Sequence, residues 1–325
     1  MKKVSFVWSC CVMTFFVACQ QAEVENLEAD DLRMSIVASI NNQKETPGSR
    51  YAGETPDIVD FTADDAIGLF VDNNPVVEWV YDGENNWSSG EKVVYWPDKT
   101  RSHTFRAFYP YPKTETNTYT YASVPMPSLL NQTGTIESIS KCDFLIATKS
   151  QTYTDGGTVE FKGTESSFKH VSTLLQLTFV QGSELTGAVL NKIKIEGSNI
   201  VTSSSYSFET GNVTLNPNTT SDVLMADGLS HKMSDGGNFY FIVNEKKDGT
   251  LPVKLTVEYT ANGKKYVAQK SGFANNLFAG GMCQKYTVTV QNSSLIISGN
   301  EISSWGTGVP LDNVEINGEE TTASV

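Results

Sequence analysis

The sequence is poor in the residues that build metal and catalytic sites. Its 325 residues include three histidines, His103, His170 and His231, which show no paired spacing. The chain also lacks a nucleophile elbow, a phosphate-binding loop, a dinucleotide-binding glycine pattern and a CxxC motif. We therefore expect no catalytic residues, no metal ligands and a protein that is not an enzyme.

Positive charge is also scarce. The chain has 24 Lys and Arg residues against 37 Asp and Glu residues, which gives a net charge of −13. No basic cluster interrupts this acidic character, and an acidic surface repels phosphate backbones. Nucleic acid is therefore excluded as an expected partner.

No apolar run is long enough for a permanent membrane span, which needs roughly 20 residues. Lys2 and Lys3 precede an uncharged, mostly apolar stretch over 4–18, which is typical of an export signal at 1–18. Cys19 follows directly, in a sequence similar to a lipobox, where the thiol takes a diacylglycerol group. The alternative is a plain secretory signal that contains a cysteine. The acidic, glutamine-containing stretch after Cys19 indicates a solvated tether.

Short runs with β-strand character recur through the rest of the chain. They fall at 66–71, 92–96, 103–111, 143–148, 174–179, 191–197, 238–243, 252–260, 264–270, 285–291 and 294–298. The pattern over 252–260 alternates apolar and polar residues, and an Asn-Gly turn joins it to 264–270 as a hairpin. Only 165–176 and 273–280 could hold a short helix. The sequence therefore predicts an all-β protein of stacked sheets, with a soft boundary between two halves near 160–170.

The segment before the first of these runs has its own pattern. Residues 32–40 form a plausible strand that places Met34, Ile36, Ala38 and Ile40 on one face. A polar, Gly- and Pro-containing stretch with Arg50 follows at 41–56, and loops of this kind are where proteases cut. A strand between a lipid anchor and such a loop could be removed as one piece.

Three further features leave alternatives open. Asp64-Asp65 and Asp72-Asn73-Asn74 could bind calcium, although solvated turn carboxylates are the simpler interpretation. The aromatic residues crowded into 79–111 could form a sugar-stacking surface, but their alternation favours a core. Cys142 and Cys283 could pair in an oxidising compartment or remain two buried thiols.

An ordered set of motifs resembles the fimbrillin family of Bacteroidales, the subunits of type V pili. The motifs are FTADDAIGLFV (61–71), NNW, YWPD (95–98), FRAFYPY (105–111), DFLIAT (143–148), FKHVSTLLQLTF (168–179) and EISSWGTG (301–308). The resemblance implies two tandem transthyretin-like β-sandwiches, at 51–164 and 165–325. In this pattern Asp143 opens the strand that closes the first domain, and His170 lies near the start of the second.

The resemblance also implies a route of export and assembly. The precursor is an outer-membrane lipoprotein, with diacylglycerol and acyl groups such as palmitate on Cys19 and no other cofactor. A surface protease then cuts after an arginine, best matched by Arg50 with Arg33 as runner-up, and removes the tether and first strand at 19–50. The strand of Met34, Ile36, Ala38 and Ile40 would have plugged a groove, which a strand from another pilus subunit then fills.

The position of the subunit in such a pilus is left open by the sequence. Residues 313–317 (NVEIN) offer a short piece that could be donated or could close the last sheet. A different class of function also stays open, that of an uncleaved surface lipoprotein that binds glycans or another host or cell ligand. That function would need the aromatic residues on a surface.

Overall fold

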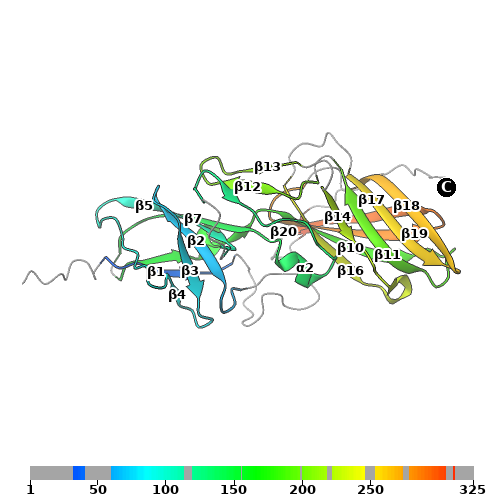
Figure 1. Ribbon diagram of the computed structural model, residues 1–325, viewed down its shortest axis with the longest axis horizontal. Coiled ribbons are helices and arrows are strands. Elements are labelled where there is room, and N and C mark those ends of the chain that lie inside the picture. The colour runs from blue at the N-terminus through cyan, green and yellow to red at the C-terminus, as the bar shows by residue number, and fades with distance from the viewer. Residues whose placement is uncertain are drawn as a thin grey trace, which may run out of the picture.

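The computed structural model describes residues 32–40, 60–112, 119–154, 156–197, 200–217, 222–245, 253–273, 278–304 and 310–311. Nearly all of its regular structure is β, which confirms the predicted fold class. The molecule is elongated, with one group of strands at each end (Figure 1). Among the described residues, no helix is long and apolar enough to cross a membrane.

A six-stranded antiparallel sheet forms the N-terminal end, in the order β4-β3-β2-β5-β7-β9. Its strands are β2 (Ala66–Val71), β3 (Val77–Tyr81), β4 (Trp87–Ser88), β5 (Ser102–Tyr109), β7 (Leu145–Thr152) and β9 (Lys169–His170). A separate parallel pair, β1 (Ser35–Ala38) and β8 (Thr158–Phe161), shares the hydrophobic core of this sheet. The parallel pair and the six-stranded sheet are thus two layers over one core.

Two five-stranded sheets pack face to face at the other end around a second core. The first has the order β16-β10-β19-β20-β21, formed by β10 (Thr173–Gln181), β16 (Asn238–Val243), β19 (Met282–Gln291), β20 (Ser294–Ser304) and β21 (Pro310–Leu311). The second has the order β14-β11-β17-β18, formed by β11 (Val189–Glu196), β14 (Val223–Ala226), β17 (Val253–Ala261) and β18 (Lys264–Phe273), with β15 (His231–Lys232) added to β11. This is a β-sandwich, whereas the transthyretin-like topology stays a prediction.

The predicted hairpin is confirmed. β17 pairs with β18 in antiparallel register, and Asn262 and Gly263 connect them with φ angles of 50° and 72°. Two consecutive positive φ angles are what a two-residue hairpin turn with the right-handed twist requires. The Asn-Gly pair therefore sets the register of this hairpin.

The helices lie elsewhere than predicted. Residues 165–176 contain only the end of α3 (Gly163–Ser166) and then run through β9 into β10. Among the described residues, the other helices are α2 (Ile136–Ser140) and the short 3-10 helix η1 (Met233–Asp235). Part of 273–280 lies outside the described residues. Likewise, 92–96 is not a regular strand, although Tyr95 makes an isolated bridge to Arg33.

A small three-stranded sheet lies between the two ends (Figure 1). It has the order β13-β12-β6, with β6 (Val124–Pro125), β12 (Ser204–Ser207) and β13 (Asn212–Leu215). β6 precedes the last strands of the six-stranded sheet in sequence but pairs with β12 from the second half. Strands distant in the sequence therefore tie the two ends together.

The junction between the two ends is buried. Asp143 precedes β7 and His170 belongs to β9, and their Oδ1 and Nδ1 atoms lie 3.1 Å apart. Val171 N donates to Phe144 O at 3.1 Å, and Ser172 is fully buried. The family pattern placed His170 near the start of the second domain; in the structure it lies in β9, at the edge of the N-terminal sheet, where it contacts Asp143.

Candidate functional site

The parallel pair of β1 and β8 is the part of the fold that bears on the predicted removable strand. Residues Ser35 to Ala38 lie in register with Thr158 to Phe161. Ser35 N donates to Gly157 O at 3.2 Å, and Ser39 N donates to Phe161 O at 2.9 Å. These bonds show that alternate residues of the segment direct their main-chain groups toward β8.

The opposite edge of this segment is held only at its start. Met34 N donates to Val94 O at 2.9 Å, and Trp96 N donates to Leu32 O at 2.8 Å. Beyond these bonds, the main chain of Ile36 and Ala38 has no partner on that side among the described residues. β1 is therefore bound along its length by one strand and anchored to a second segment at one end.

Side-chain burial follows the predicted alternation. Met34, Ile36 and Ile40 are only 4%, 3% and 5% exposed, and Ala38 is half-buried against the same core. Ser35 lies on the opposite, exposed face. Each buried side chain of this size contributes about 1.5–3 kcal/mol. The segment thus fills part of the apolar space beneath the six-stranded sheet.

Gly157 allows β1 to approach closely. Its φ is 62°, and a Cβ at this position would lie 2.4 Å from the carbonyl oxygen of Arg33. Gly157 O also accepts a hydrogen bond of 2.7 Å from Nε1 of Trp96, which is 1% exposed. The absence of a side chain at residue 157 therefore helps to define the path of the segment.

The other predicted site residues are placed as follows. Arg33 is exposed, and its main chain forms the bridge to Tyr95 immediately before β1. Cys19 and Arg50 lie outside the described residues. Cys142 and Cys283 are two separate buried thiols, and burial raises the pKa of the Cys142 thiol to about 11.

The aromatic residues of 79–111 form core rather than a surface platform. Buried members of this group are Trp79, Tyr81, Trp87, Trp96, Phe105, Phe108 and Tyr109. Tyr95 is the exposed exception, with 44% of its surface exposed beside Arg33, and Tyr111 is half-buried. The core interpretation of this aromatic-rich stretch is thus confirmed for most of its members.

Two of the candidate calcium ligands, Asp65 and Asp72, accept internal hydrogen bonds through their side chains. Asp65 accepts from the Tyr109 hydroxyl at 2.8 Å and from Thr62 N at 2.7 Å. Asp72 Oδ2 lies 2.7 Å from Nδ1 of the buried His103. Within the described ranges, no group of three or more metal-ligating side chains occurs.

Hydrogen bonds favour the ionised form of the Asp72 carboxyl group. Partial burial acts to raise the pKa of its carboxyl group. Bonds from Thr104 N and from the His103 ring, with the charges of His103 and Arg106, outweigh that effect and hold the pKa below its ordinary value. Asp72 and His103 thus link the turn after β2 to β5.

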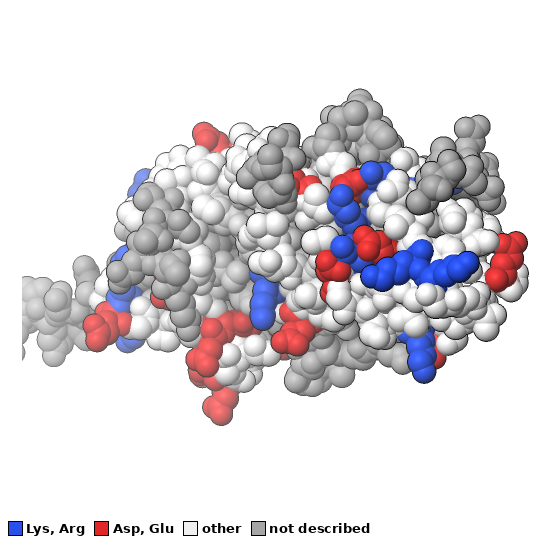
Figure 2. Space-filling model, turned by 45° about the vertical axis from the view of Figure 1, so that its right-hand side comes forward, with Lys and Arg blue, Asp and Glu red and all other residues white. Residues whose placement is uncertain are grey.

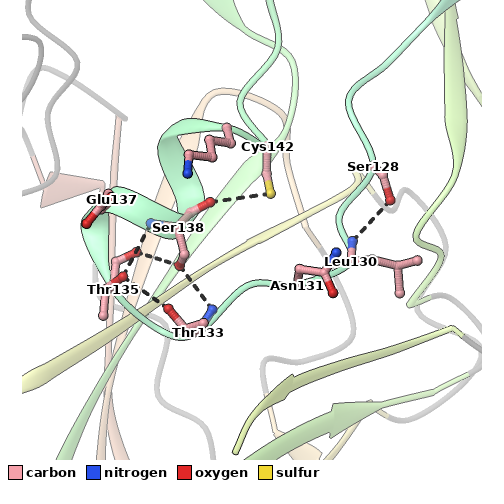
Figure 3. A pocket seen from close by; sticks show the side chains of 9 residues that line it. Ser128, Leu130, Asn131, Thr133, Thr135, Glu137, Ser138 and Cys142 are labelled. Atoms are coloured by element: carbon pink, nitrogen blue, oxygen red, sulfur yellow. Dashed lines mark hydrogen bonds between the residues drawn. The ribbon is translucent and has the colours of Figure 1, made fainter.

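A pocket of about 550 Å³ lies beside α2 (Figure 3). Its lining is mostly polar and includes Ser128, Leu130, Thr133, Glu137 and Cys142. Several of these polar groups form hydrogen bonds with one another or with the neighbouring main chain. Thr133 N donates to Ser138 Oγ at 3.0 Å, and Leu130 N donates to Ser128 Oγ at 3.3 Å. These bonds stabilise the loop around α2.

One side-chain contact near this pocket could not be predicted from the sequence. Gln132 is 1% exposed, and its side chain accepts from Ile242 N at 2.7 Å and donates to Ile242 O at 2.9 Å. Nearby, Tyr240 N donates to Gly134 O at 2.9 Å. The amide group therefore covers the outer edge of β16 as a neighbouring strand would.

The charged residues on the outer face of β11 and β17 pair with one another. Lys192 lies 3.2 Å from Asp227 and 3.5 Å from Glu258, and Glu196 contacts both Lys194 and Lys254. Figure 2 shows basic and acidic side chains interspersed over this end of the molecule. Acidic partners thus neutralise the lysines on this face.

Solved structures similar to this chain share its fold. A proposed cell adhesion protein from Bacteroides ovatus has a TM-score of 0.56 and 20% identity, over 84% of this chain and 97% of that chain. A proposed cell adhesion protein from Bacteroides uniformis has a TM-score of 0.53 and 16% identity, over 84% and 98%. A fimbrial protein from Bacteroides vulgatus has a TM-score of 0.50 and 12% identity, over 84% and 99%.

No curated protein matches the sequence. The family model described as fimbrillin-like matches residues 50–305. That match covers most of the chain and includes both ends of the fold. The chain therefore belongs to the fimbrillin-like family.

Proposed function

We propose that this protein is a structural or adhesive subunit of a cell-surface pilus, exported as a lipoprotein and assembled by strand exchange after its first strand is cut off. The observation that carries the proposal is the docking of residues 34–40. Their apolar side chains enter the first core. Among the described residues, Ser35 to Ala38 pair with β8 as their one partner strand, and bonds from Met34 to Val94 and from Phe168 to Ser39 hold the two ends of the segment. Such a segment fills a groove and can still leave it.

Removal of β1 would expose two kinds of surface together. The main-chain groups of β8 would lose their partner, and the core would lose the side chains of Met34, Ile36 and Ile40. A strand from another subunit would satisfy both requirements at once, which is the principle of β-augmentation. Until cleavage, β1 occupies the site and suppresses premature association.

The geometry favours Arg50 over Arg33 as the cleavage site. Arg33 precedes β1, so a cut after it would leave Met34 to Ile40 attached to the body. In addition, the neighbours of Arg33 are held by main-chain bonds to Val94 and Trp96. A cut after Arg50 would separate the whole of β1 from the rest of the chain.

Cleavage alone would not release the strand at once. Three buried side chains at about 1.5–3 kcal/mol each, with main-chain bonds at about 1 kcal/mol each, would keep β1 docked. Exchange therefore requires an incoming strand that competes for the same groove. Lipid on Cys19 would hold the uncut precursor at the outer membrane until then.

The comparisons support the adhesive, pilus-type role in this proposal. The family is fimbrillin-like, and the similar structures named above are described as cell adhesion or fimbrial proteins. An adhesive pilus-type role at the cell surface fits both. The proposed partners are other pilus subunits, with host or bacterial surface ligands for an adhesive member.

The decisive experiment compares Arg50→Ala with Arg33→Ala in cells that produce pili. We expect Arg50→Ala to fold normally, to keep its lipidated Cys19 and to stay out of the pilus. The Arg33→Ala control should assemble, with Tyr51 as the mature N-terminus. Normal assembly of Arg50→Ala would refute Arg50 as the switch. A native protein that retains Cys19 and never enters fibres would favour the uncleaved ligand-binding lipoprotein.

A further inference from the structure

The buried face between β1 and β8 alternates in side-chain size. Ile36 lies in register with Val159, and Ala38 lies in register with Phe161. Continuing the same register by one residue sets Met34 beside Gly157, which has no side chain. Met34 thus lies beside a residue without a side chain, and Ile36 lies beside Val159, which is of similar size. The small Ala38 lies beside the large Phe161.

Phe161 is fixed in its position by other aromatic rings. Its ring centroid lies 5.8 Å from that of Phe168, which in turn lies 5.2 Å from that of Phe61, both at steep interplanar angles. All three are core residues, and Phe161 and Phe168 are fully buried. Ala38 is half-buried against this core in register with Phe161, so a larger side chain at residue 38 would crowd the aromatic cluster, which close-packed interiors resist.

Ile40 adds a fourth requirement. It is 5% exposed and bridges to Phe168, where Phe168 N donates to Ser39 O at 2.9 Å. The groove therefore takes four alternate side chains of which the third is small, in the order Met34, Ile36, Ala38 and Ile40. All four are apolar in β1.

We propose that the strand which replaces β1 carries this same size order and comes from a subunit with a different sequence. This inference rests on the proposed strand exchange and specifies its partner. In a second copy of this chain, the candidate for donation is the strand-like piece at 313–317 with the residues after it. That segment has alternating Val314, Ile316, Gly318 and Glu320.

Ile316 and Gly318 fit the second and third positions, and Val314 is a smaller apolar residue at the first, but Glu320 does not fit the fourth. With Gly318 beside Phe161, a strand parallel to β8 places Glu320 in the site of Ile40. An antiparallel strand places Glu320 in the site of Ile36. Moving the parallel strand by two residues puts Ile316 beside Phe161 and Asp312 in the site of Met34. Each arrangement buries a carboxylate without a partner, which is strongly unfavourable.

A displacement experiment tests the inference. The chain from Cys19 to Val325 carries a fluorophore on Cys19 and an engineered protease site directly after Arg50. After cleavage, peptides compete with the docked β1 segment, and its release is followed by fluorescence anisotropy. The peptides are 32–41, its Ala38→Leu and Val37→Leu forms, and 312–321 with and without Glu320→Ile.

We expect the 32–41 peptide and its Val37→Leu control, which changes the opposite face, to release the segment with similar potency. Ala38→Leu and wild-type 312–321 should be at least about 10-fold less effective, a difference of about 1.4 kcal/mol. Glu320→Ile should recover most of the lost potency. Equal potency of Ala38→Leu and 32–41, or of 312–321 with and without Glu320→Ile, would overturn the inference. Failure of every peptide, including 32–41, would instead refute strand exchange itself.

Discussion

The hydroxyl groups of Ser35 and Thr158 lie 2.8 Å apart, although 123 positions separate them in the sequence. They are register partners on the exposed face of the parallel pair. On the other face, their neighbours Ile36 and Val159 are buried in the first core. The earliest described strand is thus held by one of the last strands at this end of the fold, and a cut in the intervening chain would leave that contact intact.

Loss of a buried side chain on β1 should weaken its docking. We expect Ile36→Ala to lower the free energy of unfolding of this region by about 2–4 kcal/mol, because Ile36 is 3% exposed and truncation leaves a cavity. Amide hydrogen exchange of Val37 and Ser39 would report the change. The Val37→Ala control, on the opposite face, should cost about 1 kcal/mol or less. Equal exchange rates in the two variants would contradict the described packing.

Gly157 and Gly156 form a matched pair for testing the close approach of β1. Both have positive φ, so alanine at either position should cost about 1 kcal/mol of backbone strain. Only at Gly157 would the new Cβ also meet a main-chain atom, the Arg33 carbonyl oxygen. We expect Gly157→Ala to lose at least 1 kcal/mol more than Gly156→Ala in urea unfolding. Faster proteolysis within 32–40 should accompany that loss, and identical behaviour of the two variants would argue against it.

Gln132 should be required for the stability of the second sandwich. Gln132→Ala would leave the N–H and C=O groups of Ile242 buried without their side-chain partner. We expect a loss of about 2–4 kcal/mol, since each unsatisfied buried group costs about 1–3 kcal/mol. Thermal unfolding measures the effect, with the exposed Ser183→Ala as control. A change within experimental error would show that another group replaces the amide.

The lowered pKa of Asp72 predicts an acid-sensitive contribution to stability. A carboxyl group with a depressed folded-state pKa stabilises the fold above its unfolded pKa of about 3.9, and this stabilisation is lost as pH falls through the folded value. The Asp72 side chain is 42% exposed, so solvent screening limits the effect to roughly 0.5–1 kcal/mol. We expect Asp72→Asn to be less stable than the wild type at pH 6.

The same difference should shrink toward pH 2, as protons bind to the wild-type carboxyl group. Urea unfolding at the two pH values measures it, and Glu91→Gln, an exposed residue, serves as the control. A difference between Asp72→Asn and the wild type that does not change with pH would show that the hydrogen bonds, rather than the charge, are responsible.

Local patterns sufficed to predict strands whose periodicity was strong. The run 66–71 coincides with β2, and the alternation over 252–270 specified both strands of the β17–β18 hairpin and the turn between them. Period-2 alternation also identified the shared face of Met34, Ile36, Ala38 and Ile40. It could not distinguish 92–96 from a regular strand, because apolar content alone does not supply a continuous hydrogen-bonded partner.

The sequence by itself determined the all-β class, the turn chemistry and the side of β1 that turns inward, because each of these depends on residues close together in the chain. Only the tertiary structure decided that β1 runs parallel to β8, that Gly157 admits the Arg33 carbonyl oxygen and that Gln132 covers β16. Such pairings join segments separated by long stretches of chain. Their choice depends on which surfaces fit together once the cores have packed, and no local pattern contains that information.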